Sequence, residues 1–121
     1  MARCEQGYLC EICGKEVENI SESELYLRFV IGELEPERLH TTAEKHLRCN
    51  PTLAQFIVDD RFEPISVSGP MGKSQLDFQY VADREALLSR GFARLMDIEA
   101  EGPEGDITTY PLPEAIERYK S

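Results

Sequence analysis

Four of the six cysteines and histidines of this chain, the residue types that bind transition metals, occur in two closely spaced pairs. Cys10 and Cys13 form the first pair, and His46 and Cys49, further along the chain, repeat the same spacing. Each pair can hold an ion from one turn of backbone, so only two segments have to meet. Three thiolates and one imidazole make a closed tetrahedral donor set that suits zinc and leaves no position for water. The pattern therefore predicts one structural Zn²⁺ bound by these four residues.

Two other residues compete for the fourth position. Cys4 precedes Cys10 at a spacing that permits an N-terminal cluster of three thiolates closed by Cys49, in which Cys4 replaces His46. His40 is the second competitor, but it lies before the predicted second pair, and we expect it at the surface. The sequence leaves open whether Cys4 or His46 is the fourth ligand.

The elements that must position the first pair are a turn and a strand. Gly14 directly follows Cys13 and allows the tight turn of a zinc knuckle, in which backbone N–H groups face the thiolates. Residues 25–31 alternate apolar side chains with period two, which predicts a strand. The first pair is therefore expected on a turn that precedes a strand.

The second pair is predicted beside a helix. Thr41 or Thr42 is placed to cap a helix over 43–48, and Asn50 followed by Pro51 predicts the start of another helix over 51–58. Cys49 would then lie at the corner between two helical segments.

The rest of the chain is predicted to be mainly helical. Asp77 is expected to cap a helix over 78–90, with Phe78 among its core residues and Gly91 either ending it or lying inside a longer helix. Three further elements are a strand over 62–68, a weak strand over 107–110 and a terminal helix over 113–119.

The order of knuckle, strand and ligand-bearing helix resembles treble-clef and zinc-ribbon-like domains. Cys10, Cys13, His46 and Cys49 fit that general arrangement over residues 8–58. The resemblance implies an α+β fold, in which a small zinc-stapled N-terminal module packs with a mainly helical C-terminal half, residues 59–121. Length alone predicts a single domain, residues 1–121.

Charge and hydropathy exclude several classes of function. The chain has 121 residues with 13 Lys and Arg against 23 Asp and Glu, a net charge of −10, which argues against non-specific nucleic-acid binding and against anionic membranes. No apolar run reaches the roughly 20 residues of a membrane span, and no apolar signal region follows Met1. We therefore expect a cytoplasmic protein that does not bind membranes.

Several segments resemble known catalytic or ligand-binding motifs but lack residues that these motifs require. Residues 69–74 resemble a phosphate-binding loop but have too few residues between the glycines, and residues 97–102 open like a calcium loop that lacks its closing glutamate. A thiol-redox role for Cys10 and Cys13 would require a βαβ context that the sequence does not show. No Ser, His and Asp set can be assembled, so an enzyme is the least favoured reading.

The sequence predicts an interaction module, an adaptor or accessory subunit that presents a zinc-stabilised surface to a protein partner. The alternative is a nucleic-acid-associated zinc protein that uses a local basic cluster of Arg38, Lys45 and Arg48. A zinc-dependent or thiol-redox enzyme ranks third. The identity of the partner and the oligomeric state cannot be predicted from this pattern.

Overall fold

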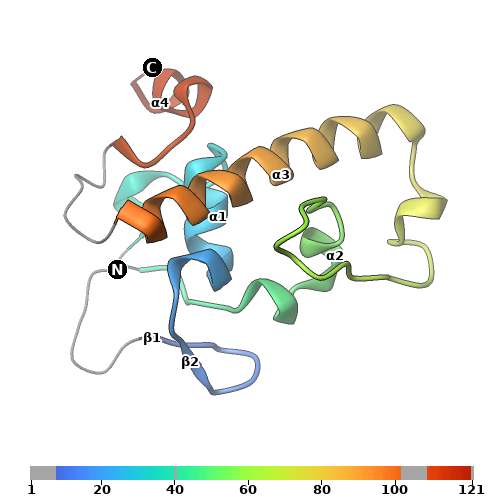
Figure 1. Cartoon of the computed structure of the whole chain (residues 1–121), viewed down its shortest axis with the longest axis horizontal. Helices are drawn as coiled ribbons and strands as arrows, with labels where there is room; N and C mark the ends of the chain where they lie inside the picture. The colour runs from blue at the N-terminus through green and yellow to red at the C-terminus, as the bar shows by residue number, and fades with distance from the viewer. Residues whose placement is uncertain (1–7, 40, 102–108, 121) are drawn as a thin grey trace.

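The computed structural model describes residues 8–39, 41–101 and 109–120, and most of these residues are helical. Four α-helices are present in these ranges: α1 (Glu24–Val30), α2 (Pro51–Ala54), α3 (Phe78–Glu101) and α4 (Pro113–Lys120). Helix α3 runs along the length of the molecule and crosses α1, while α4 and the N-terminal hairpin lie on opposite sides in Figure 1. Shorter 3-10 helices occur at Ile20–Glu22, Pro36–Arg38, Leu47–Cys49 and Lys73–Gln75.

The β structure among the described residues is one short ladder and two isolated bridges, Ser23 with His46 and Asp59 with Phe62. Strands β1 (Tyr8–Leu9) and β2 (Glu16–Val17) pair antiparallel, with Tyr8 opposite Val17 and Leu9 opposite Glu16. The predicted α+β class is therefore correct for its helical half, whereas its β component amounts to this ladder and the two bridges within the part of the chain that the structure describes.

The segment predicted as a strand, residues 25–31, is mostly α1, and that prediction is wrong. Ser23 is the N-cap, and its side-chain oxygen accepts a hydrogen bond from the backbone N–H of Tyr26 at 3.0 Å. Every residue from Glu24 to Ile31 except Arg28 is buried. When nearly every residue of a segment is buried, its apolar residues follow neither the period of a helix nor that of a strand. The alternation at residues 25–31 therefore could not distinguish the two.

A Schellman motif ends α1. Gly32 adopts φ +91°, its N–H donates to the carbonyl of Phe29, and the N–H of Glu33 donates to the carbonyl of Arg28. Glycine reaches this left-handed conformation without the steric cost that other residues meet. The chain turns back at this point and carries Leu34 into the core.

Helix α3 begins where the sequence predicts and continues past the predicted stop. The carboxylate of Asp77 accepts from the backbone N–H of Tyr80 at 3.0 Å, which confirms the predicted cap. Phe78 was expected in the core but is 86% exposed, because it lies on the first turn, beyond the part of α3 that contacts α1. The buried face of α3 consists of Leu88, Gly91, Phe92, Leu95 and Ile98.

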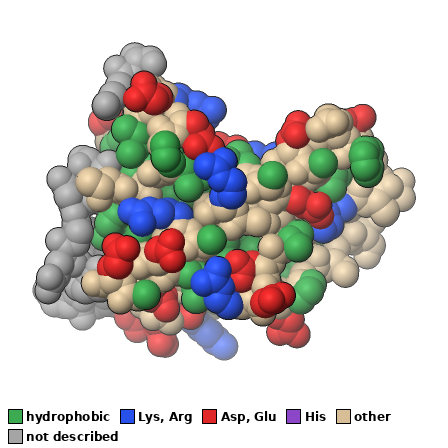
Figure 2. Space-filling model, turned by 45° about the horizontal axis from the view of Figure 1, so that its top comes forward, with side chains coloured by type: hydrophobic (Ala, Val, Ile, Leu, Met, Phe, Trp, Pro, Cys, Tyr) green, Lys and Arg blue, Asp and Glu red, His purple; other side chains and the backbone are tan. Residues whose placement is uncertain are grey.

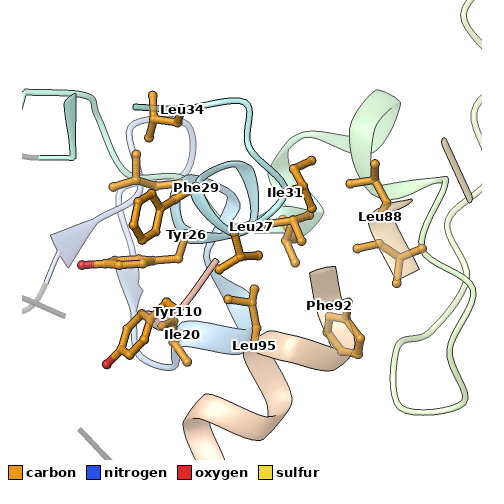
Figure 3. Packing of buried hydrophobic residues seen from close by; sticks show 14 of the residues in the cluster. Ile20, Tyr26, Leu27, Phe29, Ile31, Leu34, Leu88, Phe92, Leu95 and Tyr110 are labelled. Carbon is orange, nitrogen blue, oxygen red and sulfur yellow. The ribbon is translucent and has the colours of Figure 1, made fainter. Parts of the chain in front are cut away.

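The core lies between α1 and α3. Leu27 and Ile31 lie together with Leu88, Phe92 and Leu95 in Figure 3, all buried in one cluster. Gly91 is inside the helix because α1 approaches it closely: a Cβ there would lie 2.5 Å from Cγ2 of Ile31. The long α3 is therefore held against the short α1 by a backbone-to-side-chain contact that only glycine permits.

Helix α4 covers the carboxyl end of α1, and its prediction over 113–119 is confirmed. The Tyr119 ring stacks on Phe29 at a centroid distance of 5.9 Å, and its hydroxyl group donates to the Phe29 carbonyl at 2.9 Å. Arg118 donates to the carbonyl of Gly32 at 2.9 Å. These bonds tie α4 to backbone carbonyls at and just after the end of α1.

Four other predicted elements need correction. No α-helix forms over 43–48: the carbonyls of Glu44 and Lys45 accept from the N–H groups of Glu11 and Glu24, and only the 3-10 helix Leu47–Cys49 follows. The helix predicted over 51–58 stops at Ala54, and Asn50 makes no side-chain cap. The strand over 62–68 is absent apart from a single bridge between Asp59 and Phe62. The strand over 107–110 lies partly outside the described residues, and Thr109 and Tyr110 are not in a strand.

The surface mixes charges of both signs. On the face in Figure 2, Lys and Arg side chains lie among Asp and Glu and among hydrophobic side chains. None of the helices in the described ranges combines the length and apolarity needed to cross a membrane.

Candidate metal site

The first ligand pair lies on the loop of the β1–β2 hairpin, which has the geometry of a knuckle. The N–H of Cys10 donates to the carbonyl of Lys15 at 2.9 Å, and the N–H of Gly14 donates back to the carbonyl of Cys10 at 2.9 Å. Gly14 has φ +78°, the conformation predicted from its place after Cys13. This turn buries the Cys10 side chain and leaves Cys13 exposed.

The second pair flanks a 3-10 turn and not an α-helix. His46 is the N-cap of Leu47–Cys49, and the N–H of Cys49 donates to the carbonyl of His46 at 3.0 Å. The preceding backbone is extended: the N–H of Glu11 donates to the carbonyl of Glu44 at 3.0 Å, and Ser23 bridges His46. Backbone hydrogen bonds between these segments thus bring the knuckle and the second pair together. The knuckle was predicted correctly, but the predicted strand after it is helix α1, and the predicted ligand-bearing α-helix is a 3-10 turn.

The four predicted ligands meet in space. One donor atom from each of Cys10, Cys13, His46 and Cys49 lies within 4.8 Å of all the others. His46 Nδ1 is 3.3 Å from the Cys13 sulfur and 3.9 Å from the Cys49 sulfur. Bonds of about 2.3 Å to sulfur and about 2.0–2.1 Å to nitrogen place a sulfur and a nitrogen about 3.6 Å apart in a regular tetrahedron. The observed separations bracket that value, so the cluster has the dimensions to hold one metal ion.

The orientation of His46 is fixed by its other ring nitrogen. Nε2 lies 3.0 Å from the carbonyl oxygen of Glu16, and a carbonyl can only accept, so Nε2 carries the proton. The neutral ring then presents a lone pair on Nδ1 towards the sulfur atoms. A histidine ligand held by a backbone carbonyl in this way is a recurring arrangement around metals.

The sulfur atoms differ in their surroundings. The Cys10 sulfur accepts backbone N–H groups from Ile12 and His46, both at 3.4 Å. Burial raises the pKa of the Cys10 thiol, but backbone hydrogen bonds from Cys13, His46 and Ile12 lower it to about 6 overall. Burial and the neighbouring Cys10 and Cys13 raise the pKa of Cys49 to about 11. Burial lowers the pKa of His46, but hydrogen bonds to Cys10, Glu16 and Cys13 outweigh it and leave the pKa raised.

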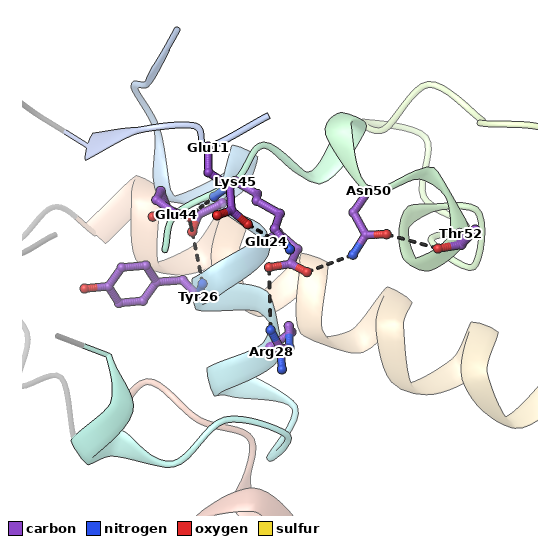
Figure 4. Close-up of polar contacts among 9 residues, drawn as sticks. Glu11, Glu24, Tyr26, Arg28, Glu44, Lys45, Asn50 and Thr52 are labelled. Carbon is purple, nitrogen blue, oxygen red and sulfur yellow. Dashed lines mark hydrogen bonds and ion pairs between the residues drawn. The ribbon is translucent and has the colours of Figure 1, made fainter. Parts of the chain in front are cut away.

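A buried polar network joins the second pair to α1, as Figure 4 shows. Ser23 Oγ donates to a Glu44 carboxylate oxygen at 2.8 Å, and the same oxygen accepts the N–H of Lys45 at 3.0 Å. Asn50 Nδ2 donates to Glu24 at 2.8 Å. Both glutamates are almost fully buried, Glu24 at 2% and Glu44 at 4% exposure, and burial raises the pKa of the Glu44 carboxyl. The segment that carries His46 is therefore anchored on both sides to the first turn of α1.

The other candidate ligands, Cys4 and His40, lie outside the described residues. The basic residues of the nucleic-acid alternative have varied surroundings: Arg38 is exposed, Lys45 lies 3.5 Å from Glu11, and Arg48 stacks over the Phe62 ring at 4.4 Å. Nucleic-acid binding through these residues stays a prediction.

Two groups of site residues escaped the sequence reasoning. The Glu16 carbonyl is a backbone group, which no pattern of side chains reveals. Ser23 and Glu44 were missed as well, although a serine directly before a glutamate and an apolar run is a recognisable helix-start signal.

Comparison with known proteins adds no relative: no protein-family model, no curated protein and no solved structure matches this chain. The case for the site therefore rests on its own geometry.

Proposed function

We propose that Cys10, Cys13, His46 and Cys49 bind one Zn²⁺ as a structural site. The observation that carries this proposal is the convergence of their four donor atoms within 4.8 Å, with His46 Nδ1 aimed at the sulfurs by the Glu16 carbonyl. Three thiolates and one imidazole favour zinc over hard cations and fill all four tetrahedral positions. With no position left for water, the ion has no Lewis-acid role at rest.

The hairpin needs such an ion because it buries little apolar surface. Of its described side chains, Cys10 and Val17 are buried, whereas Leu9 and Ile12 are 62% and 60% exposed. A two-residue ladder is marginal by itself. Zinc contributes about 10–16 kcal/mol in small finger peptides, which is ample to hold the hairpin against residues 44–49.

The proposed role of the site is to present the hairpin to a protein partner, as an adaptor or accessory subunit would. Leu9, at the end of β1, and Ile12, on the turn, are large exposed apolar side chains of a hairpin whose backbone the metal would hold rigid. Rigid apolar side chains lose little conformational entropy on binding, which favours their use as contact residues.

Native mass spectrometry of the full chain, purified gently from zinc-replete cells, tests the metal. We expect one zinc per chain, lost in Cys49→Ser and in His46→Ala. Cys4→Ser is the matched control and should keep its zinc. Loss of zinc in Cys4→Ser, with zinc retained in His46→Ala, would identify Cys4 and not His46 as the fourth ligand. A metal-free wild type would refute the proposal.

A second experiment tests the role. The double variant Leu9→Asp, Ile12→Asp should keep its zinc and lose a stoichiometric protein partner that accompanies the wild type from its own cells. Val58→Asp is the control, because Val58 is equally exposed at 61% and lies elsewhere. Equal partner retention in the two variants would refute the hairpin as the contact surface.

A further inference from the structure

A cavity of about 540 Å³ opens beside the candidate metal site. Three of the four ligand residues, Cys13, His46 and Cys49, line one side of it, and residues of α3 line the other. Its volume lies within the range of about 300–1,000 Å³ that small-molecule sites occupy. A single ion bound by these residues would fill only a small part of a cavity of this volume.

The inner wall of the cavity is apolar and belongs to the core. Phe62 and Phe92 lie edge to face with centroids 5.2 Å apart, both almost fully buried, and Met96 packs against the same cluster. Side chains fixed in this way form a preorganised surface for an apolar or aromatic group.

The rim of the cavity is cationic in a strongly acidic protein. Lys15, Arg48 and Arg61 line it, with Glu22 as the one carboxylate among its lining residues. Arg48 is held over Phe62 and donates to the Glu63 carbonyl at 2.9 Å, and Arg61 is held by Asp59 at 2.9 Å. A guanidinium has five N–H donors, so both retain donors for a further anion.

We propose that this cavity binds a small organic anion with an apolar body, which lies against Phe62, Phe92 and Met96 while its acidic group pairs with Arg48 and Arg61. Charge complementarity favours an anion: three cations line the cavity against one carboxylate, Glu22, and Asp59 binds only Nε and one terminal nitrogen of Arg61. The inference goes beyond the metal site and depends on it only for the wall that Cys13, His46 and Cys49 form.

The test uses the full-length protein and the amphipathic anion 8-anilinonaphthalene-1-sulfonate, followed by fluorescence and by amide NMR shifts. We expect saturable one-to-one binding with shifts centred on Phe92 and Met96. Met96→Trp should fill the cavity and abolish this binding. Arg61→Gln should weaken it about tenfold, the effect of losing one charge-assisted hydrogen bond.

Arg38→Gln is the matched control, because it removes the same charge from an exposed residue outside the cavity lining. Equal affinity in the Arg61 and Arg38 variants, shifts centred elsewhere, or no binding by zinc-loaded protein would each overturn the inference. Metal content measured on the same sample reports separately on the proposed zinc site, so the two failures can be distinguished.

Discussion

Gly91→Ala sets two effects of opposite sign against each other at the contact between α3 and α1. Alanine favours a helix over glycine by about 1 kcal/mol, so the change stabilises α3 locally. The new methyl group, however, would lie 2.5 Å from Cγ2 of Ile31 and 2.9 Å from Cδ1 of Leu27. Carbon atoms in contact prefer about 3.5–4.0 Å, so both neighbours would have to move.

The two neighbours differ in how easily they move. Leu27 Cδ1 is the end of a flexible side chain and can turn away, whereas Ile31 Cγ2 is attached directly to a branched Cβ and moves only with its rotamer or backbone. Both residues are fully buried, so little space is free around them. Overpacking of this kind costs about 1–3 kcal/mol. We expect the upper part of that range, which leaves a net destabilisation of about 1–2 kcal/mol after the helix gain.

Urea unfolding at fixed excess zinc measures this free energy, and Ala86→Gly supplies the reference. Ala86 is exposed on the same helix, so its change to glycine should cost about 1 kcal/mol through helix propensity alone. Gly91→Ala gains about this helix propensity, so the packing cost at Gly91 is the measured loss of unfolding free energy in Gly91→Ala plus the loss measured in Ala86→Gly. A Gly91→Ala protein more stable than wild type would show that α1 and α3 are not in tight contact and would refute the reasoning.

Three further outcomes follow from single contacts. Ser23→Ala removes the α1 cap and a donor to buried Glu44, and should lower the free energy of unfolding by about 2 kcal/mol in urea titrations. Tyr119→Phe removes the hydroxyl group that bonds to backbone carbonyls around the end of α1, and should cost about 1–2 kcal/mol by the same assay. Hydrogen bonds from Arg61 hold the pKa of Asp59 at about 2. The stabilisation from this pair is therefore complete above the ordinary pKa near 4 and is lost as the pH falls through about 2. Carboxyl NMR of Arg61→Gln should show the Asp59 pKa raised towards its ordinary value, with the backbone N–H of residue 61 still lowering it.

The elements that sequence reasoning located are those with a local signal. Asp77 starts α3 with its own carboxylate, and Pro113 opens α4 at the first helical position, so both helix starts can be read from neighbouring residues. Residues 25–31 offered no such contrast, because a helix buried on nearly all sides and a buried strand have the same composition. Gly91 was ambiguous for a different reason: a glycine required by a neighbouring helix cannot be distinguished locally from one that ends its own.

That Cys10, Cys13, His46 and Cys49 come together was predictable, because few residue types can bind a transition metal and their spacing in the sequence is visible directly. The spacing of Cys10 and Cys13 requires only a turn, and Gly14 supplies it locally. The approach of the second pair to the first was not predictable, since the carbonyls of Glu44 and Lys45 accept hydrogen bonds from Glu11 and Glu24, which are distant in sequence. Pairing between distant segments depends on the whole fold, which no local pattern encodes.

These cross-segment bonds also connect the candidate site to the core. The backbone N–H of Glu24, in the first turn of α1, donates to the carbonyl of Lys45 at 2.9 Å, and Ser23 caps α1 while bonding Glu44. An ion bound at His46 would fix this segment, and with it the cap of the helix on which α3 and α4 pack. Stabilisation by the metal would thus extend beyond the hairpin to the start of α1, through residues that never touch the ion.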